Sequence, residues 1–592
     1  MLSNVLAIGV GLVAWPLISY TYPNFKLLSQ IPLFGGTFWH AHSNKGVITP
    51  QLSTFIEHTL ALEHITGLSV AVVPKQGEPE FHTWGHRSED GDEVTPETRF
   101  HMASVSKAFC ATALGLLIDD FEHGWNVTAL PTGMTELTWH TRLRDVLPGP
   151  GDEGWALMDT WASERANFKD ILGHVSGVPR HDAAYGPSDK PLHMIGRLRY
   201  LRPAFELREQ WSYNNIMYMV AAHVIETYAG QSYTSFVQER LFAPLGMTST
   251  TFSPAEAEAS GKMTHGWTKE GRRVPECFNE ETALAMAGPG GIISNVIDMA
   301  KWISTWINEG VYDNQTVIPD YVYKNVSYSY SVAIDHPTDP EHSIVGYGMG
   351  WFRTSYRGHD VVWHSGALPG LSTLVSFLPS DEIGVTLFAN GEDKAEPLML
   401  VLKRILDSAL GLTSSLSHTS SPSARNATQT EPDARNATLS LSLDAFAGTY
   451  TNPGYGPFTL CSPSSPSTYC TKIQSDFSIV DNAQGTSASV SNSKDLLAAW
   501  SRVWSSHVRM RHQHDVVFDV YLTSLYPDGY GKDTTPFAKE RGIGTADGVA
   551  EFVVEEGRVV GFGLSGFVGQ VTERARTYEG VRDRAEVWFD RV

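Results

Sequence analysis

A short stretch of the chain places two reactive side chains where a strand-like segment meets a long apolar helix pattern. Residues 98–102 have the composition of a strand, and residues 108–121 are mostly apolar. Ser104 and Lys107 lie between them, at the predicted start of the helix. Because residues i and i+3 share one helix face, the Lys107 amine can contact the Ser104 hydroxyl. A desolvated lysine can help to remove the proton of a serine, so this junction predicts a rigidly held nucleophile.

The Ser-x-x-Lys spacing alone is weak support, because it also arises by chance. A second copy, Ser491 and Lys494, lies in a polar run over residues 482–495 that has the composition of a loop. Taken alone, the first copy would be explained equally well by a helix cap at Ser104 with a solvated lysine. Further polar clusters are needed to decide.

Two such clusters follow along the chain. Tyr213 and Asn215 precede an apolar helix pattern over residues 216–230. His364 lies in an apolar, strand-like segment over residues 361–366. Polar clusters that each adjoin a buried element are the usual way to build a preorganised site.

In this order, the three clusters resemble the serine β-lactamase and penicillin-binding-protein superfamily, one of whose signatures is Ser-x-x-Lys. The nearest resemblance is to the class C β-lactamase-related, peptidase family S12-like group, including its fungal-type hydrolases. It extends over about residues 45–410. The segments that carry it include DILGHVSGVPRHD at residues 170–182, AGPGGIISNVIDMAKW at residues 287–302 and YGMGWF at residues 347–352.

The resemblance implies a role for each matching residue of the first two clusters. Ser104 is the nucleophile that becomes acylated, and Lys107 is its partner in proton transfer. Tyr213 is the general base or relay, and Asn215 orients Lys107 and the substrate amide. Free tyrosine and lysine both titrate near about 10, so neither is a good base at neutral pH unless its pKa is shifted. We therefore expect Tyr213 and Lys107 to accept the Ser104 proton together, as a coupled pair.

The resemblance also places His364, Ser365 and Gly366 where relatives carry the substrate-binding strand Lys-Thr-Gly. The oxyanion hole is then expected from the backbone N–H groups of Ser104 and Ala367. A histidine is mostly neutral at pH 7, so a permanent anchor for a substrate carboxylate is missing at this strand. This departure favours the His-x-Gly type of esterase or aminopeptidase over β-lactam hydrolysis and cell-wall transpeptidation. A histidine that simply packs in the strand is the alternative.

The fold class implied by the resemblance is α/β, an antiparallel sheet flanked by helices with an inserted helical subdomain. Residues 68–85 read as a hairpin, and residues 346–390 read as successive strands. Such a fold would place Ser104 and Tyr213 across a cleft from the strand of His364. The last part of the chain has the short alternating segments of an all-β unit, and residues 448–456 resemble the opening of the lipocalin-like barrel that some relatives carry.

The chain of 592 residues is too long for one core, and its composition suggests four parts. Residues 1–35 contain an apolar run that suits a signal peptide, with an uncleaved membrane anchor and a buried helix as alternatives. Residues 36–411 are the predicted catalytic domain, and residues 441–592 the predicted β domain. Between them, residues 412–440 form a Ser/Thr-rich linker in which ARNAT occurs twice. We expect a secreted or secretory-pathway glycoprotein, or a membrane-anchored one if the leader is retained; the sequons lie at Asn126, Asn314, Asn325, Asn426 and Asn436.

The four cysteines fit this location. Cys461 and Cys470 bracket a short loop rich in serine and proline, and a disulfide between them is favoured over a free pair. Cys110 lies on the helix after the nucleophile, where it is expected to pack. Cys277 is expected to be a lone thiol.

Four residues near the motifs have two interpretations each. His181 and Asp182 either line the cleft or cap the following turn. Trp211 and Trp363 flank the second and third clusters, where they either form an acyl pocket or pack in the core.

Charge and motifs also narrow the partners. The net charge of -21 and the absence of a basic cluster disfavour nucleic acid and anionic membranes, so a membrane is expected only through an uncleaved leader. No metal and no organic cofactor is expected, since His512 and His514 fit a solvated strand better than a metal site. The expected partner is a small-molecule ester or amide, or a short peptide. Oligomer formation is left open.

Hydrolysis of a small ester or amide through an acyl-Ser104 intermediate is the first hypothesis. An acyltransferase or transesterase of secondary metabolism ranks second, and a β-lactamase or D,D-peptidase third. A catalytically inactive binding module is the alternative from a different class. It is disfavoured because the nucleophile, lysine, tyrosine and asparagine of the pattern are all present.

Overall fold

The computed structural model describes residues 46–149, 154–413, 439, 441–485, 494–540, 546–568 and 577–592. The predicted leader, nearly all of the predicted linker, and Ser491 lie outside the described residues, so the proposed division into four parts stays a prediction. Residues 47–592 form one compact unit. Within the described ranges, every helix is too short or too polar to cross a bilayer.

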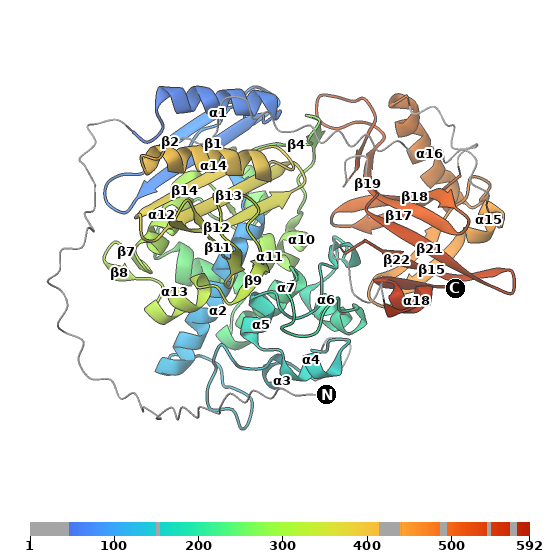
Figure 1. Ribbon diagram of the computed structural model, residues 1–592, viewed down its shortest axis with the longest axis horizontal. Helices are drawn as coiled ribbons and strands as arrows, with labels where there is room; N and C mark the ends of the chain where they lie inside the picture. The colour runs from blue at the N-terminus through green and yellow to red at the C-terminus, as the bar shows by residue number, and fades with distance from the viewer. Residues whose placement is uncertain are drawn as a thin grey trace, which may run out of the picture. The chain divides into compact units, whose positions relative to one another are not determined.

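An eight-stranded antiparallel sheet forms the centre of the first part of the chain (Figure 1). The expected hairpin at its edge and the successive strands that end the segment are confirmed, with a reversal at Arg357 and Gly358. The strands, in spatial order, are β2 (Glu80–Gly85), β1 (Gly67–Pro74), β14 (Ile383–Ala389), β13 (Leu371–Leu378), β12 (His359–Leu368), β11 (Phe352–Tyr356), β10 (Val345–Tyr347) and β9 (Ser331–Ile334).

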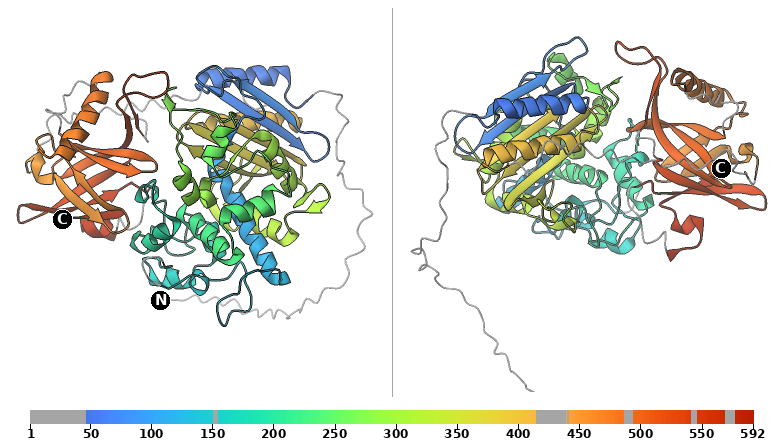
Figure 2. Two further views of the ribbon diagram at one scale, coloured as in Figure 1. Left: turned by 180° about the vertical axis from the view of Figure 1, so that it is seen from behind. Right: turned by 45° about the horizontal axis from the view of Figure 1, so that its top comes forward.

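Helices cover both faces of this sheet, which explains why its central strands are apolar on both sides. Alternate residues of β1 enter two separate cores: Val70 packs with α1 (Pro50–Leu62) and α14 (Ala395–Ala409), and Ala71 packs with α12 (Val296–Ile307). Figure 2 shows α1 and α14 side by side over the sheet. The sheet is therefore held rigidly from both faces, as a support for side chains at its far strands.

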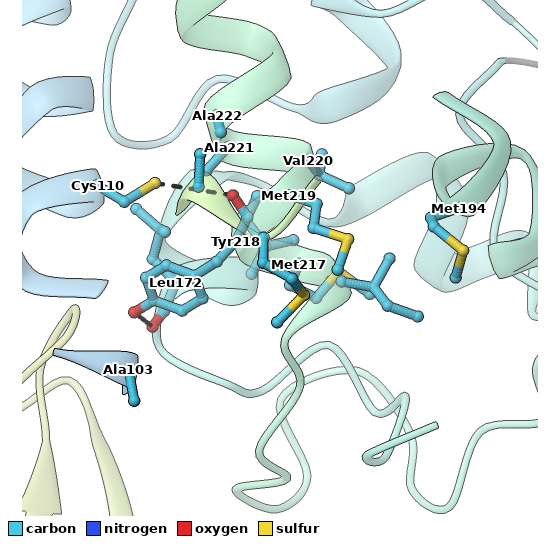
Figure 3. Close-up of a cluster of buried hydrophobic side chains, with 14 of the residues drawn as sticks. Ala103, Cys110, Leu172, Met194, Met217, Tyr218, Met219, Val220, Ala221 and Ala222 are labelled. Atoms are coloured by element: carbon cyan, nitrogen blue, oxygen red, sulfur yellow. Dashed lines mark hydrogen bonds between the residues drawn. The ribbon is translucent and has the colours of Figure 1, made fainter. Parts of the chain in front are cut away.

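The inserted helical part lies between β2 and β9 and is centred on α2 (Ser106–His123), which is buried on all sides over most of its length. α2 packs against α7 (Ile216–Ala229), where Cys110 lies against the Tyr218 carbonyl and the Tyr218 hydroxyl donates to the Leu172 carbonyl at 2.7 Å (Figure 3). The predicted packing role of Cys110 is confirmed, and Cys277 is also a free thiol. The other helices here are α3 (Leu143–Val146), α4 (Thr160–Arg165), α5 (Phe168–Leu172), α6 (Pro191–Arg197), α8 (Tyr233–Val237), α9 (Pro254–Ala259), α10 (Glu280–Ala285), α11 (Ala287–Gly290) and α13 (Asp320–Ser327).

Two boundaries near the nucleophile differ from the sequence-based expectation. The strand expected over residues 98–102 is reduced to β3 (Phe100–His101), which pairs with β6 (Ile293–Ser294). Ser104 does not begin the long helix but lies in a single 3-10 turn, Ala103–Val105, directly before α2. Ser104, the predicted nucleophile, thus lies on a separate turn between β3 and α2.

The last part of the chain is a nine-stranded antiparallel sheet that curls into a nearly closed barrel, which confirms the predicted all-β domain. Its open ends meet where Cys461 and Leu497 exchange backbone hydrogen bonds, and the predicted Cys461–Cys470 disulfide is present. Among the described residues, the helices that flank it are α15 (Leu443–Phe446), α16 (Thr468–Ala483) and α18 (Val581–Arg584). The strands are β16 (Gly456–Leu460), β15 (Gly448–Asn452), β23 (Val587–Arg591), β22 (Arg558–Ser565), β21 (Gly548–Glu555), β19 (Val517–Tyr526), β18 (Ser505–His514) and β17 (Asp495–Arg502), with β20 (Phe537–Glu540) beside β19.

Candidate active site

The turn that carries Ser104 is held in a strained conformation by its neighbours. Ala103 has a φ of 47°, which a residue with a side chain rarely adopts. The Thr373 hydroxyl donates to the Met102 carbonyl at 3.1 Å, which ties this turn to the sheet. A Cβ at Gly366 of β12 would lie 2.4 Å from the same carbonyl, so only glycine lets the strand approach this closely.

Lys107 is fully buried beneath Ser104. Its Nζ lies 3.1 Å from Ser104 Oγ, 2.7 Å from Asn215 Oδ1 and 2.8 Å from the Pro289 carbonyl oxygen. Burial holds the pKa of Lys107 well below the usual lysine value, and the positive charge of Arg180 lowers it further. The two carbonyl oxygens can only accept hydrogen bonds. In the neutral form of the amine they would take both N–H groups, and the lone pair of the Lys107 nitrogen would face the Ser104 hydroxyl.

Tyr213 contacts the nucleophile from the other side. Its hydroxyl lies 2.7 Å from Ser104 Oγ, and its ring is sandwiched between the Lys107 nitrogen at 4.7 Å and the Arg180 guanidinium at 4.6 Å. Burial raises the pKa of Tyr213 to about 12, although the charge of Arg180 and the hydrogen bond with Ser104 lower it. Tyr213 is therefore a neutral phenol, and the geometry favours Lys107 over the tyrosine as the group that accepts the Ser104 proton.

Asn215 is oriented by a carboxylate that sequence reasoning had left undecided. Its Nδ2 donates to Asp182 Oδ1 at 2.9 Å, which fixes the amide oxygen towards Lys107. Asp182 also accepts from the Tyr185 hydroxyl at 2.8 Å, and its Oδ2 lies 2.8 Å from Arg180 Nε. Asp182 thus lies at the cleft, connected to the lysine through one amide. The sequence offered no sign of this connection beyond the position of Asp182 within the 170–182 segment.

His181 points away from this group of residues. It is buried, with Nδ1 2.7 Å from the Tyr455 hydroxyl and Nε2 3.0 Å from the Arg202 carbonyl oxygen. Burial lowers the pKa of His181 to about 4, so the ring is neutral. It connects the helical part to the barrel and is not exposed in the cleft.

His364 lies on β12, buried behind the nucleophile. Its Nδ1 is 2.6 Å from the Ser365 carbonyl oxygen, and its Nε2 is 3.2 Å from the Tyr347 hydroxyl. Burial and the nearby Lys107 charge lower the pKa of His364 to about 3, so the ring is neutral at pH 7. His364 does not line the cavity that contains Ser104, whereas Ala367 does. The predicted catalytic role of His364, and the oxyanion and substrate-binding roles of Ser104, Ala367, Ser365 and Gly366, stay predictions.

A cavity of about 210 Å³ opens at Ser104. The barrel supplies part of its wall, since Trp504 from the β17–β18 turn and Lys539 from β20 both line it. Lys539 forms an ion pair with Glu392 at 2.8 Å. Sequence reasoning missed these contributions because they come from segments without a motif. The remaining lining residues are Ala103, Arg180, Asp182, Asn215, Phe278, Met286, Pro289, Gly290, Ala367, Leu368, Pro369 and Asp393.

The two tryptophans that flank the motifs do not line this cavity. Trp211 borders a separate groove of about 830 Å³ along β9, which does not include Ser104, and Trp363 packs in the core on the far face of the sheet. The core interpretation therefore holds for Trp363, and neither residue forms a wall of the Ser104 cavity.

The histidine pair of the barrel matches the expected strand but not the expected solvation. His512 and His514 lie on β18 as expected for a strand, but His512 is buried against Phe518 and is not solvated. Among the described residues, no group of three or more His, Cys, Asp or Glu side chains is arranged to hold a metal ion.

Comparison with known proteins matches this chain to one family model and to relatives from two fungi. The family model described as Beta-lactamase matches residues 52–410. The unguisins hydrolase ungD' of Aspergillus campestris is 30% identical over 345 residues, covering 57% of this chain and 60% of that protein. The unguisins hydrolase ungD of Aspergillus violaceofuscus is 26% identical over 446 residues, covering 68% of this chain and 75% of that protein. The chain thus spans 60% of the length of the first of these relatives.

One solved structure supports the fold over most of the chain. The octameric penicillin-binding protein homologue from Pyrococcus abyssi superposes with a TM-score of 0.50 and 18% identity, over 86% of this chain and 97% of that one.

Proposed function

The chain belongs to the Beta-lactamase family, and on this premise we propose that it is a serine hydrolase that cleaves a small ester or amide through an acyl-Ser104 intermediate. One observation carries the proposal: Lys107 Nζ lies 3.1 Å from Ser104 Oγ, and two carbonyl oxygens at 2.7 Å and 2.8 Å are placed to take the N–H groups of the neutral amine. A buried, neutral amine in this position is a general base for the serine.

Acylation follows from this geometry. Ser104 Oγ attacks the substrate carbonyl carbon while its proton passes to Lys107 Nζ. The negative oxygen of the tetrahedral intermediate is bound by the backbone N–H groups of Ser104 and Ala367, which typically contribute about 3 kcal/mol each. The Tyr213 phenol, 2.7 Å from Ser104 Oγ, gives its proton to the departing oxygen or nitrogen. The Lys107 ammonium then returns a proton to the phenolate, which restores the neutral pair.

Deacylation reverses these roles. A water molecule attacks the acyl carbon and gives its proton to Lys107, and Ser104 Oγ leaves as the C–O bond breaks and takes the proton back. The two relatives named as unguisins hydrolases support water over an alcohol or amine as the acceptor. The neutral ring of His364, in the place of the family's strand lysine, supports an ester or amide other than a β-lactam.

Intact-mass spectrometry after treatment with a fluorophosphonate or a p-nitrophenyl ester tests the proposal. Wild-type protein and a Ser491→Ala variant are expected to gain one adduct, because Ser491 belongs to the other Ser-x-x-Lys copy. Ser104→Ala is expected to gain none. No adduct on the wild type, or an unchanged adduct on Ser104→Ala, would contradict the proposal.

A further inference from the structure

Arg180 presents unused hydrogen-bond donors beside the nucleophile. Its side chain is 46% exposed, its Nε lies 2.8 Å from Asp182 Oδ2, and its guanidinium covers the face of the Tyr213 ring at 4.6 Å. Within the described part of the chain, no acceptor contacts its two terminal amino groups. Both Arg180 and Ser104 line the same cavity. Arg180 is thus a fixed cation whose donors face the space where a substrate must lie.

The other charged groups in or beneath this cavity do not present free hydrogen-bond donors to a bound molecule. Lys539 is 7% exposed and is neutralised by Glu392 at 2.8 Å, and Lys107 lies beneath the cavity floor with its nitrogen occupied. Asp182 divides its charge between Arg180 and two neutral donors, and Asp393 is exposed at the side of Glu392. Arg180 is therefore the cation in this cavity whose terminal donors lack a protein partner among the described residues.

We propose that Arg180 binds a carboxylate of the substrate. Its two terminal amino groups match the two oxygens of a carboxylate, and such charge-assisted pairs are among the strongest hydrogen bonds in proteins. Asp182 holds the guanidinium at Nε without covering its terminal edge, so the donor pair is preorganised. The substrate class is an ester or amide that carries a carboxylate near the scissile bond. This inference rests on the proposed function, because it takes acylation of Ser104 as given.

The position of Arg180 on the helical side of the cleft compensates for His364 on the strand side. The neutral His364 ring does not line the cavity and offers no positive charge to an anion there. The anionic group of the substrate is therefore held from the wall that carries Asn215 and Asp182, and not from β12.

Matched ester pairs test the inference and identify which part of the substrate carries the charge. The p-nitrophenyl hemiester of succinic acid and its methyl-capped form place or remove a carboxylate on the acyl side. The second pair, 3-acetoxybenzoate and its methyl ester, places or removes a carboxylate on the leaving-group side. For at least one pair, wild type is expected to favour the carboxylate form in kcat/KM. In Arg180→Gln this preference should fall about tenfold or more, mainly through KM, and in Arg180→Lys by less.

A role limited to holding Asp182 would lower kcat for both members of a pair and leave their ratio unchanged. That outcome, or a wild-type ratio at or below one for both pairs, would overturn the inference. Arg558→Gln, at the exposed start of β22 in the barrel, is the matched control and should keep the wild-type ratios.

Equilibrium binding gives an answer independent of turnover. Calorimetric titration of the succinate hemiester into Ser104→Ala should show affinity that is lost in Ser104→Ala/Arg180→Gln, and equal affinity in both proteins would contradict the inference. Failure of the proposed function would look different, since no ester would then leave an adduct on wild-type Ser104.

Discussion

At the scale of single residues, the direction of proton transfer depends on how many acceptors surround one amine. Lys107 Nζ has three oxygen neighbours, two of which cannot give a proton away. An ammonium would bond to all three and leave Ser104 without a base. Burial lowers the pKa of Lys107 and so favours the neutral amine, which is the form that can accept the Ser104 proton.

Lys107→Arg tests whether residue 107 acts by accepting the Ser104 proton or only by carrying a positive charge. The guanidinium stays protonated, so it cannot accept the Ser104 proton. We expect the rate of acylation by a p-nitrophenyl ester to fall about 10²- to 10⁴-fold, the usual contribution of a general base. Stopped-flow release of p-nitrophenol measures this rate. Lys262→Arg, at an exposed position, is the control, and equal rates in the two variants would count against Lys107 as the base.

Asp182 is expected to set the pH dependence of acylation. Activity requires neutral Lys107, so kcat/KM rises with pH through the pKa of this lysine. Burial and Arg180 lower that pKa, and the Asp182 charge raises it. In Asp182→Asn the raising influence is gone, so the rising limb of the profile should move to lower pH. Asp320→Asn, at an exposed position at the start of α13, should not move it, and a shift of the Asp182→Asn profile to higher pH would refute the argument.

The motifs identified four residues that lie close together in the structure. The spacing within each motif reflects one local element, so each pair could be found from the sequence. Ser104 and Lys107 share a turn and a helix start, and Tyr213 and Asn215 lie at the entrance to α7. Arg180 was not predicted as a site residue, because its place at the cleft depends on contacts with Asp182 and Tyr213 that no local pattern encodes.

At the scale of elements, the nucleophile turn is positioned by glycines that let neighbouring strands approach. Gly350, in the turn before β11, has a φ of 89°, and a Cβ there would lie 2.6 Å from the Ala108 nitrogen of α2. This close approach packs the turn against the backbone of Lys107. The 347–352 segment was recognised from the sequence, but the sequence did not show that this segment packs against the backbone of α2.

Gly350→Ala should therefore destabilise the protein and disturb Lys107. The clash and the left-handed φ together are expected to cost about 2–4 kcal/mol. Gly358→Ala is a matched control, since its φ is 95° but nothing lies within 4 Å of the added Cβ, and it should cost about 1 kcal/mol. Urea unfolding measures the stabilities, and ester turnover the active site. Equal losses in the two variants would show that the contact with α2 is unimportant.

At the scale of the whole molecule, the first part of the chain and the barrel meet at polar contacts between residues far apart in the sequence. The His181 ring bonds to the Tyr455 hydroxyl, and Lys539 pairs with Glu392. Length and composition predicted more than one folded part, and the resemblance at residues 448–456 suggested the barrel, but contacts between distant segments carry no local signature. For this reason the sequence left open whether the barrel narrows the cleft.

Buried histidines are expected to make the molecule sensitive to acid. Burial lowers the pKa of His181 to about 4 and that of His364 to about 3, whereas an unfolded histidine titrates near about 6.5. Below pH 6.5 the unfolded chain binds more protons, so stability falls as the pH falls, until the folded pKa is reached. Between pH 7 and 5 each ring should cost about 2 kcal/mol.

The urea midpoint measured at pH 7 and pH 5 checks this expectation. His181→Gln should reduce the difference between the two midpoints, whereas His336→Gln, at an exposed position, should leave it as in wild type. An unchanged difference in His181→Gln would show that this ring does not contribute.

The wall that Trp504 and Lys539 contribute has a consequence for how such proteins can diversify. The groups of the proposed proton transfer come from earlier segments of the chain, while part of the wall that limits what Ser104 can accommodate comes from a much later one. Exchanging the barrel, or only its β17–β18 turn, between homologous chains would transplant selectivity and leave the proton-transfer groups untouched. Hybrid chains of this kind would give proteins that differ in selectivity and share the same residues around Ser104.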